Sequence, residues 1–236
     1  MTKSDLPERL SEFSDNLSPA ERANFKLLLG LAAGGLTTKF ERPKLPANAV
    51  AFDVVSDSLV KMQPYSARIA NNGVAYRGRP EFMTGDFLGA LQREALELRP
   101  SASRFDEHFL GCGAPLANEL ALSEQLSGLV REHAGDVNPT GVASFLYYDE
   151  IGQGIDPHID TDIFSLNVLL MLRHRHQDGH RSCLVLLPPR SEPERLDLQE
   201  GEIVIFFAGS VAHGRERISL GEDVTVLTFG FHPLGI

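Results

Sequence analysis

Cysteine and tryptophan are almost missing from this sequence. Its 236 residues include two cysteines, Cys112 and Cys183, and no tryptophan. The two cysteines lie far apart and show no CxxC spacing, which is typical of ordinary thiols in a reducing compartment. We therefore expect two free thiols and no disulfide framework.

Long apolar runs are missing as well. No run approaches the roughly 20 apolar residues that a bilayer-spanning helix needs. The N-terminal segment is polar and acidic, unlike a signal or transit peptide. The sequence therefore predicts a cytoplasmic protein with no membrane partner.

Positive charge is scarce relative to negative charge. The chain has 22 lysines and arginines against 32 acidic residues, a formal net charge of -10. An acidic surface repels phosphate backbones, so nucleic acid is not the expected partner and a small molecule is. The hydrophobic fraction of 42% and the charged fraction of 23% are close to globular averages, which excludes general disorder.

The first 140 residues indicate helices mixed with looser segments. Ser18 and Glu21 form a capping-box pattern before an apolar helical face that we expect to stop at Gly34-Gly35. Apolar residues at helical spacing predict a second helix over 86–98 and a third over 118–133. No repeat, low-complexity tract or linker divides the chain, so we predict a single domain over 1–236.

From Gly141 onward the pattern changes to eight short apolar segments bounded by Gly, Pro, Asp and Glu, which is typical of an all-β barrel or sandwich. LNVLLML and IVIFF are apolar on both faces, so we expect these strands to be covered on both sides. The predicted fold is α+β and mainly β. A double-stranded β-helix (jelly roll) over 141–236 is covered by helices and substrate-facing loops from 1–140.

Three residues carry the chemistry. His158 and Asp160 form an H-x-D pair whose side chains share one face in an extended segment, and His213 follows several strands later. Two neutral imidazoles and one carboxylate occupy one side of an octahedral metal and leave positions open, as in non-haem Fe(II) oxygenases. We predict that these three residues bind a metal.

A second H-x-D, formed by His176, Gln177 and Asp178, lies in a polar turn between two apolar strands. We interpret this turn, which also holds His174 and His180, as a solvated hairpin tip. A local metal cluster is the alternative interpretation.

The segment from Val142 to His232 resembles the Fe(II)/2-oxoglutarate-dependent dioxygenase superfamily, particularly its prolyl-hydroxylase-like branch. The similar pieces are LYYDEIGQGIDPHID, SLNVLLML, GHRSCLVLL, EGEIVIFFAGSVAHG and VLTFGF. Their order and spacing are more specific than any single piece.

The resemblance implies an enzyme in which His158, Asp160 and His213 hold Fe(II), with 2-oxoglutarate and O2 as co-substrates and succinate and CO2 as co-products. Relatives that halogenate lack the carboxylate, so Asp160 favours hydroxylation, with desaturation or ring formation also open. We expect a small-molecule substrate, such as an amino acid or biosynthetic intermediate. The alternatives are a hydroxylase of prolyl or other protein side chains, and a non-catalytic jelly-roll metal-binding module.

The chain departs from the family at one position. Relatives place an Arg or Lys at the start of the final core strand to bind the distal carboxylate of 2-oxoglutarate, whereas this chain has Glu222 and Asp223 before that strand. Alternation along the strand predicts that Arg173 and Asn167 point inward. The other candidate cations are Arg215, Arg217 and, more weakly, Arg181. A tyrosine that hydrogen-bonds the co-substrate is expected at Tyr148, or at Tyr147 if the register differs, and Thr228 is a further pocket candidate.

Overall fold

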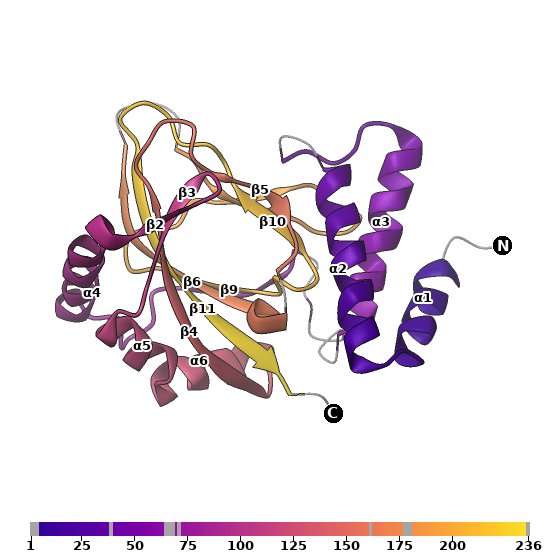
Figure 1. Cartoon of the computed structure of the whole chain (residues 1–236), viewed down its shortest axis with the longest axis horizontal. Helices are drawn as coiled ribbons and strands as arrows, with labels where there is room; N and C mark the ends of the chain where they lie inside the picture. Colours follow the sequence, from indigo (N-terminus) through magenta and orange to yellow (C-terminus); the bar gives the residue numbers. More distant parts are fainter. Residues whose placement is uncertain are drawn as a thin grey trace.

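The computed structural model describes residues 5–37, 40–63, 69, 72–160, 162–176 and 181–234. Its strands form two antiparallel sheets (Figure 1). The large sheet has the order β1-β9-β6-β11-β4-β3-β2, and the small sheet has the order β5-β10-β7-β8. In chain order the strands are β1 (Val74–Gly78), β2 (Ser103–Phe105), β3 (His108–Cys112), β4 (Val137–Tyr148), β5 (Ile155–His158), β6 (Leu166–Arg175), β7 (Leu184–Leu187), β8 (Glu194–Leu196), β9 (Ile203–Phe206), β10 (Ala212–Arg215) and β11 (Asp223–Pro233).

Six α-helices lie in the described part of the first 140 residues. They are α1 (Asp5–Asp15), α2 (Pro19–Leu36), α3 (Pro46–Lys61), α4 (Gly85–Leu98), α5 (Pro115–Ala121) and α6 (Glu124–Ala134). Helices α1 to α3 gather at one end of the sheets, and α4 to α6 lie on another side (Figure 1). None of the helices in the described residues is long and apolar enough to cross a membrane. Cys112 and Cys183 are both free, as the composition predicted.

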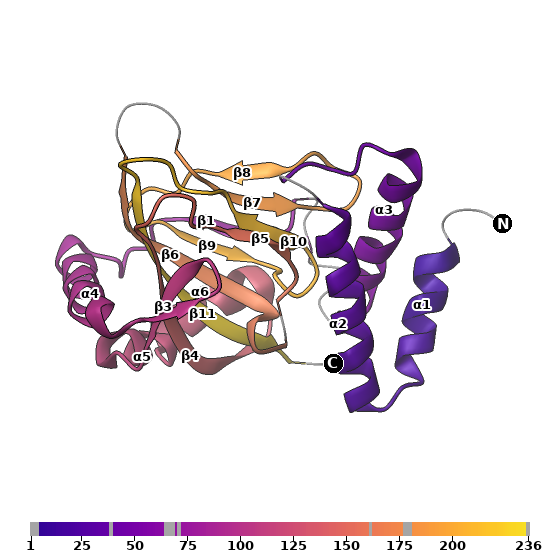
Figure 2. The ribbon, with the colours of Figure 1, turned by 45° about the horizontal axis from the view of Figure 1, so that its top comes forward.

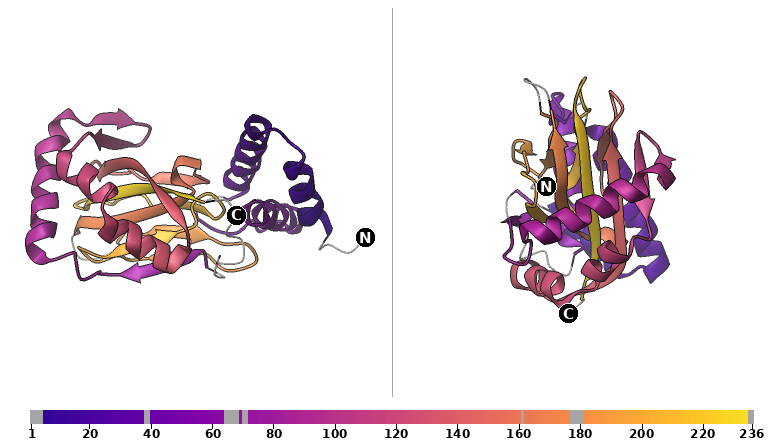
Figure 3. Two further views of the ribbon diagram at one scale, coloured as in Figure 1. Left: turned by 90° about the horizontal axis from the view of Figure 1, so that it is seen from below. Right: turned by 90° about the vertical axis from the view of Figure 1, so that its left-hand side faces the viewer.

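The large sheet is apolar on both faces, which confirms that its central strands are covered on both sides. Leu170 and Leu172 of β6 belong to a core beneath α4, α5 and α6, while Leu169 and Met171 face a second core shared with the small sheet. Figure 2 shows the strands β7 and β8 layered over the large sheet, and Figure 3 shows α4 lying across the outer side of that sheet. The space between the two sheets is therefore the interior that strand residues from both can reach.

Helix α2 begins as predicted but ends later. Ser18 caps it, with both hydrogen bonds of the capping box to Glu21 present. The predicted stop at Gly34-Gly35 is wrong, because the helix continues to Leu36. Gly34 instead allows α2 to pack closely against β5, because a Cβ atom there would lie 2.6 Å from the carbonyl oxygen of Pro157 in β5.

The other helix predictions have mixed outcomes. The helix predicted over 86–98 is confirmed as α4, with Thr84 as its N-cap. The single helix predicted over 118–133 is wrong, because Ser123 caps a new helix, α6, by accepting a hydrogen bond from the Leu126 amide at 3.2 Å. All eight predicted strand segments after Gly141 contain a strand, whereas α3 and β1 to β3 were not located from the sequence.

Candidate metal centre and active-site cavity

Antiparallel pairing of β10 with β5 brings His213 directly opposite His158. Asp160 follows β5 and lies between the two imidazoles. Its carboxylate oxygens are 3.3 Å from His158 Nε2 and 3.6 Å from His213 Nε2. One ligand atom from each residue falls within 4.8 Å of the other two. The structure thus brings the three predicted ligands together, from a strand, the turn after it and a neighbouring strand.

Backbone carbonyls fix both imidazole rings. His158 Nδ1 lies 2.9 Å from the Asp156 oxygen, and His213 Nδ1 lies 3.0 Å from the Val211 oxygen. A carbonyl oxygen only accepts, so each Nδ1 carries the proton and each Nε2 presents a lone pair. This is the outer hydrogen bond that orients metal-binding histidines.

Asp160 adds a carboxylate to the two imidazoles, and these three donors together suit a positively charged ion. The Asn167 side-chain amide donates to its Oδ2 at 2.9 Å, and the Asp160 amide donates to the Ala208 oxygen at 3.0 Å. Burial opposes ionisation of Asp160, but the neighbouring His213 and His158 outweigh it and hold the pKa of its carboxyl below the usual range. Burial likewise opposes charging of His158, yet Asp160 raises the pKa of this imidazole. Two Nε2 lone pairs and one carboxylate fit a divalent transition metal such as Fe(II).

The three residues open onto a cavity of about 620 Å³ between the two sheets. Of the further predicted site residues, Tyr148, Asn167, Arg215 and Thr228 line it. Leucine, isoleucine, valine and phenylalanine side chains make up much of the remaining wall. A cavity of this size suits a co-substrate together with a small organic substrate.

Arg215 is the cation inside the cavity. It lies on β10 two residues after His213 and is only 5% exposed. It donates to the Ser182 carbonyl at 3.1 Å and to the Ser182 hydroxyl at 3.0 Å, and its guanidinium lies 5.3 Å from the Tyr148 ring centroid. No carboxylate in the described ranges forms an ion pair with it, and its Nε has no hydrogen-bond partner there. Burial accordingly lowers the pKa of Arg215.

Glu222, the residue before β11, supports Arg215 indirectly. Its Oε1 accepts from the Ser182 hydroxyl at 2.6 Å and the Ser182 amide at 2.7 Å, and it lies 2.7 Å from His174 Nε2. Burial raises the pKa of Glu222, but hydrogen bonds from Ser182, Ser219 and His174 outweigh it and lower it to about 2. Glu222 therefore holds Ser182 in place, and Ser182 accepts the hydrogen bonds of Arg215.

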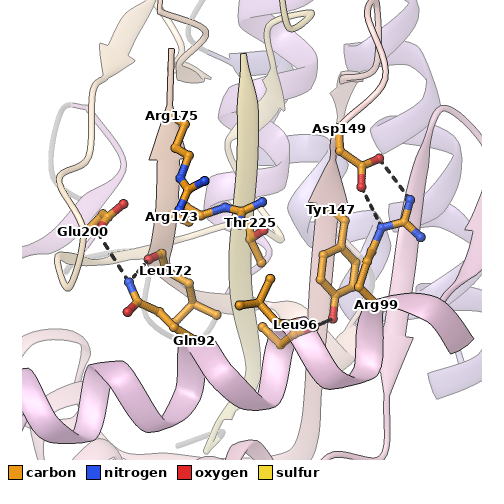
Figure 4. Close-up of a pocket in the computed structure, with 11 residues that line it drawn as sticks. Gln92, Leu96, Arg99, Tyr147, Asp149, Leu172, Arg173, Arg175, Glu200 and Thr225 are labelled. Atoms are coloured by element: carbon orange, nitrogen blue, oxygen red, sulfur yellow. Dashed lines mark hydrogen bonds and ion pairs between the residues drawn. The ribbon is translucent and has the colours of Figure 1, made fainter. Parts of the chain in front are cut away.

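The prediction that Arg173 points inward with Asn167 is wrong. Strand β6 has a β-bulge: Met171 is opposite Val226 whereas Arg173 is opposite Thr225, so Leu172 is an extra residue. The bulge reverses the alternation and turns Arg173 to the outer face of the large sheet. There it pairs with Asp223 and lines a separate hollow of about 230 Å³ beside α4 (Figure 4).

Arg217 and Arg181 lie outside the cavity too. Arg217 pairs with Glu107 and, at 2.9 Å, with Asp156, so it ties the β2–β3 hairpin to β5 at the cavity rim. It is not among the described residues that line the cavity, and its role toward the co-substrate stays a prediction. Arg181 pairs with Asp197 at 3.0 Å and donates to His174 Nδ1 at 3.2 Å.

Of the two candidate tyrosines, Tyr148 is the one that faces the cavity. Tyr148 is buried and lines the cavity, whereas the Tyr147 hydroxyl points to the outer face and donates to the Ala95 carbonyl at 2.8 Å. The second H-x-D falls largely outside the described residues, since Gln177, Asp178 and His180 are not among them. His174 is not solvated as interpreted: its side chain is 1% exposed beside Glu222.

One cavity residue had no sequence signal. His108, on β3, lies 5% exposed in the wall of the cavity and stacks on Tyr148 at 5.5 Å between ring centroids. It belongs to the first 140 residues, where no motif was found, and only the pairing of β3 with β4 places it at the site.

Comparison with known proteins gives a likeness in structure alone. No protein-family model and no curated protein sequence matches the chain. Among solved structures, the non-heme alpha-ketoglutarate-dependent epimerase SnoN from nogalamycin biosynthesis has a TM-score of 0.60 at 16% identity, covering 72% of this chain and 81% of that one. HygX from Streptomyces hygroscopicus, solved with nickel, 2-oxoglutarate and hygromycin B, has a TM-score of 0.56 at 12% identity, covering 69% and 84%.

A prolyl-4-hydroxylase from Pseudomonas putida has a TM-score of 0.55 at 17% identity, covering 75% of this chain and 100% of that one. The chain thus has the fold of the Fe(II)/2-oxoglutarate-dependent oxygenases. At the level of fold, this confirms the resemblance that the sequence motifs indicated.

Proposed function

We propose that this protein is an Fe(II)- and 2-oxoglutarate-dependent dioxygenase that hydroxylates a small molecule. In this proposal β4 to β11 form a jelly-roll core, β1 to β3 extend the two edges of its large sheet, and the whole chain acts as one catalytic domain. The observation that carries it is the placement of Arg215, a buried guanidinium with no ion-pair partner among the described residues, in the same cavity as the His158, Asp160 and His213 donor set. A metal site beside a buried cation suits a chelating ligand that carries a second carboxylate.

His158, Asp160 and His213 would hold the metal by one face and leave the other open to the cavity. When bound, Fe(II) with 2-oxoglutarate and O2 supplies the oxidation that the protein's side chains lack, with succinate and CO2 as co-products. Asn167 keeps the Asp160 carboxylate oriented. Arg215 would bind the distal carboxylate of the co-substrate, with Tyr148 and Thr228 in the adjacent wall.

Hydroxylation is the proposed outcome because the Asp160 carboxylate is present in the donor set. The likeness includes an epimerase and a carbocyclase, so the reaction type is tested on the product. A product that gains one oxygen atom identifies hydroxylation, whereas loss of two hydrogens identifies desaturation or ring formation.

Succinate release tests the activity. Purified protein with Fe(II), 2-oxoglutarate and O2 should convert 2-oxoglutarate to succinate slowly alone and faster with a substrate. His158→Ala and Asp160→Ala should each abolish this conversion, while His232→Phe, which is remote from the cavity lining, should retain it. Full activity in Asp160→Ala contradicts the proposal.

A further inference from the structure

His108 is an unused polar group in the cavity wall. Only 5% of His108 is exposed, and its Nδ1 has no hydrogen-bond partner among the described residues. Burial lowers the pKa of its imidazole, so the ring is neutral near neutral pH and offers one N–H donor and one lone pair. A buried ring nitrogen without a partner costs stability, and the imidazole that carries it forms part of the wall of the cavity that a ligand would enter.

The surroundings of His108 place it between the cavity mouth and the deep cation. Phe105, opposite it in the β2–β3 hairpin, is 62% exposed and contacts the imidazole edge to face, with ring centroids 5.7 Å apart. On its other side His108 stacks on Tyr148, whose ring lies 5.3 Å from the Arg215 guanidinium carbon. The order from mouth to interior is therefore Phe105, His108, Tyr148 and Arg215. With the proposed co-substrate at Arg215, His108 faces the space left for a substrate.

The outer cavity has an excess of negative charge, because the one cation at its rim, Arg217 among the described residues, is already paired with Glu107 and Asp156. Arg215 is the single lysine or arginine in its described lining, and the proposed co-substrate neutralises it. Near the mouth the lining carboxylates are Asp106 and Asp156, and Asp156 is already paired with Arg217. Asp106 stands next to Phe105 with a left-handed backbone (φ 53°) that aspartate and asparagine tolerate. Most of the remaining described lining is apolar and the rest is uncharged, so an anionic substrate finds no free cation there.

We propose that His108 is a substrate-binding residue that hydrogen-bonds a hydroxyl or amino group of a largely apolar substrate, and that Asp106 selects against carboxylates and favours amines. This inference rests on the proposed function, because it takes Arg215 to be occupied by the co-substrate. It names the substrate class of the same site: an uncharged or amine-bearing apolar molecule.

Binding of three matched probes tests this proposal. Cyclohexylmethylamine, cyclohexylmethanol and cyclohexanecarboxylate share one apolar ring and differ in the polar group. Each is titrated by ligand-observed NMR into protein loaded with Ni(II) and 2-oxoglutarate. The amine should bind at least about tenfold more tightly than the carboxylate, with the alcohol between them.

Two variants assign the preference to its residues. His108→Phe keeps an aromatic ring and should weaken binding of the alcohol about five- to tenfold, while 2-oxoglutarate binds unchanged. Asp106→Asn should remove most of the difference between amine and carboxylate. His232→Phe serves as the control and should leave all three affinities unchanged.

The opposite results overturn the inference. They are equal affinities for amine and carboxylate, no binding of any probe, or an unchanged alcohol affinity in His108→Phe. Uptake of 2-oxoglutarate by the metal-loaded protein is measured first. If it fails, the proposed function is contradicted. If it succeeds and the probe preferences are missing, only the role of His108 and Asp106 is contradicted.

Discussion

Gly34 of α2 touches the backbone of Pro157, the residue before the metal-binding candidate His158. A Cβ atom on Gly34 would lie 2.6 Å from the Pro157 carbonyl oxygen and 3.6 Å from the His158 Cα. Backbone atoms cannot rotate away as a side chain can. The helix therefore fixes the position of β5 by contact, and this glycine is needed for the close approach.

Gly34→Ala should displace β5 and weaken the metal site. We expect a loss of about 1–3 kcal/mol in unfolding free energy from overpacking, partly offset by the higher helix propensity of alanine. Metal affinity should fall about tenfold. Thermal unfolding and Co(II) titration measure the two effects.

The neighbouring Gly35 provides the matched control. No atom lies within 4 Å of a Cβ built there, so Gly35→Ala should stabilise the helix by about 0.5–1 kcal/mol and leave metal affinity unchanged. Equal metal affinity in both variants contradicts the proposed support of β5 by α2.

Asn167 should matter to metal binding through Asp160. Asn167→Ala removes the amide that donates to Asp160 Oδ2 at 2.9 Å, and loss of such an outer hydrogen bond typically weakens metal affinity about 10- to 100-fold. Asn138→Ala, an exposed amide on β4, is the control. Metal titration by calorimetry checks both, and an unchanged affinity in Asn167→Ala argues against its orienting role.

We expect Arg215 to support binding of 2-oxoglutarate and to lower the stability of the ligand-free protein. Arg215→Met replaces a desolvated cation with no carboxylate partner in the described part of the chain, so the melting temperature of the ligand-free protein should stay equal or rise. The stabilisation that 2-oxoglutarate gives to the metal-loaded protein should disappear.

Arg173→Ala is the matched control for this prediction, because Arg173 lies on the outer face (Figure 4) and pairs with Asp223. It should retain stabilisation by 2-oxoglutarate. If Arg173→Ala loses it and Arg215→Met keeps it, the two assignments must be exchanged.

Glu222→Gln should act on Arg215 through Ser182. The substitution changes the group that accepts from the Ser182 hydroxyl at 2.6 Å, so the KM for 2-oxoglutarate should rise about tenfold while metal affinity stays constant. Asp223→Asn, the adjacent acid on the outer face, should change neither quantity.

The effect of Glu222→Gln on the melting temperature should depend on pH. The pKa of Glu222 is lowered from 4.5 to about 2, so its ionised form contributes stability that is fully present above pH 4.5 and is lost as the pH falls toward 2. The difference in melting temperature between the native protein and Glu222→Gln should be constant above pH 4.5 and shrink below it. A difference that grows on acidification contradicts this direction.

His158 and Asp160 were predictable from sequence because their signal is local, whereas His213 was predicted from the order of the later strand segments and from the family resemblance. An H-x-D pair in an extended segment places both side chains on one face, and the strand boundaries around it are marked by Gly and Pro. Asn167 followed from alternation along its own strand, whereas Tyr148 was expected from the family resemblance. The eight strand segments were likewise marked by their apolar composition.

Local patterns could not show which of the candidate arginines enters the cavity, or that His108 forms part of its wall. One extra residue, Leu172, reverses the side of Arg173, and no local pattern marks that bulge. Arg215 and Arg217 differ by two residues, yet pairing with Glu107 and Asp156 draws Arg217 to the rim. His108 reaches the site only through the pairing of β3 with β4, a contact between distant segments.

The most direct test of the account is spectroscopic. Fe(II) is added anaerobically to the protein, followed by 2-oxoglutarate, and the visible absorption is recorded for the native protein, Asp160→Ala and Arg215→Met. The account predicts a weak charge-transfer band in the native protein, its absence in Asp160→Ala, and a much higher 2-oxoglutarate requirement in Arg215→Met. Bound Fe(II) without any band on saturation with 2-oxoglutarate would contradict the proposed co-substrate site.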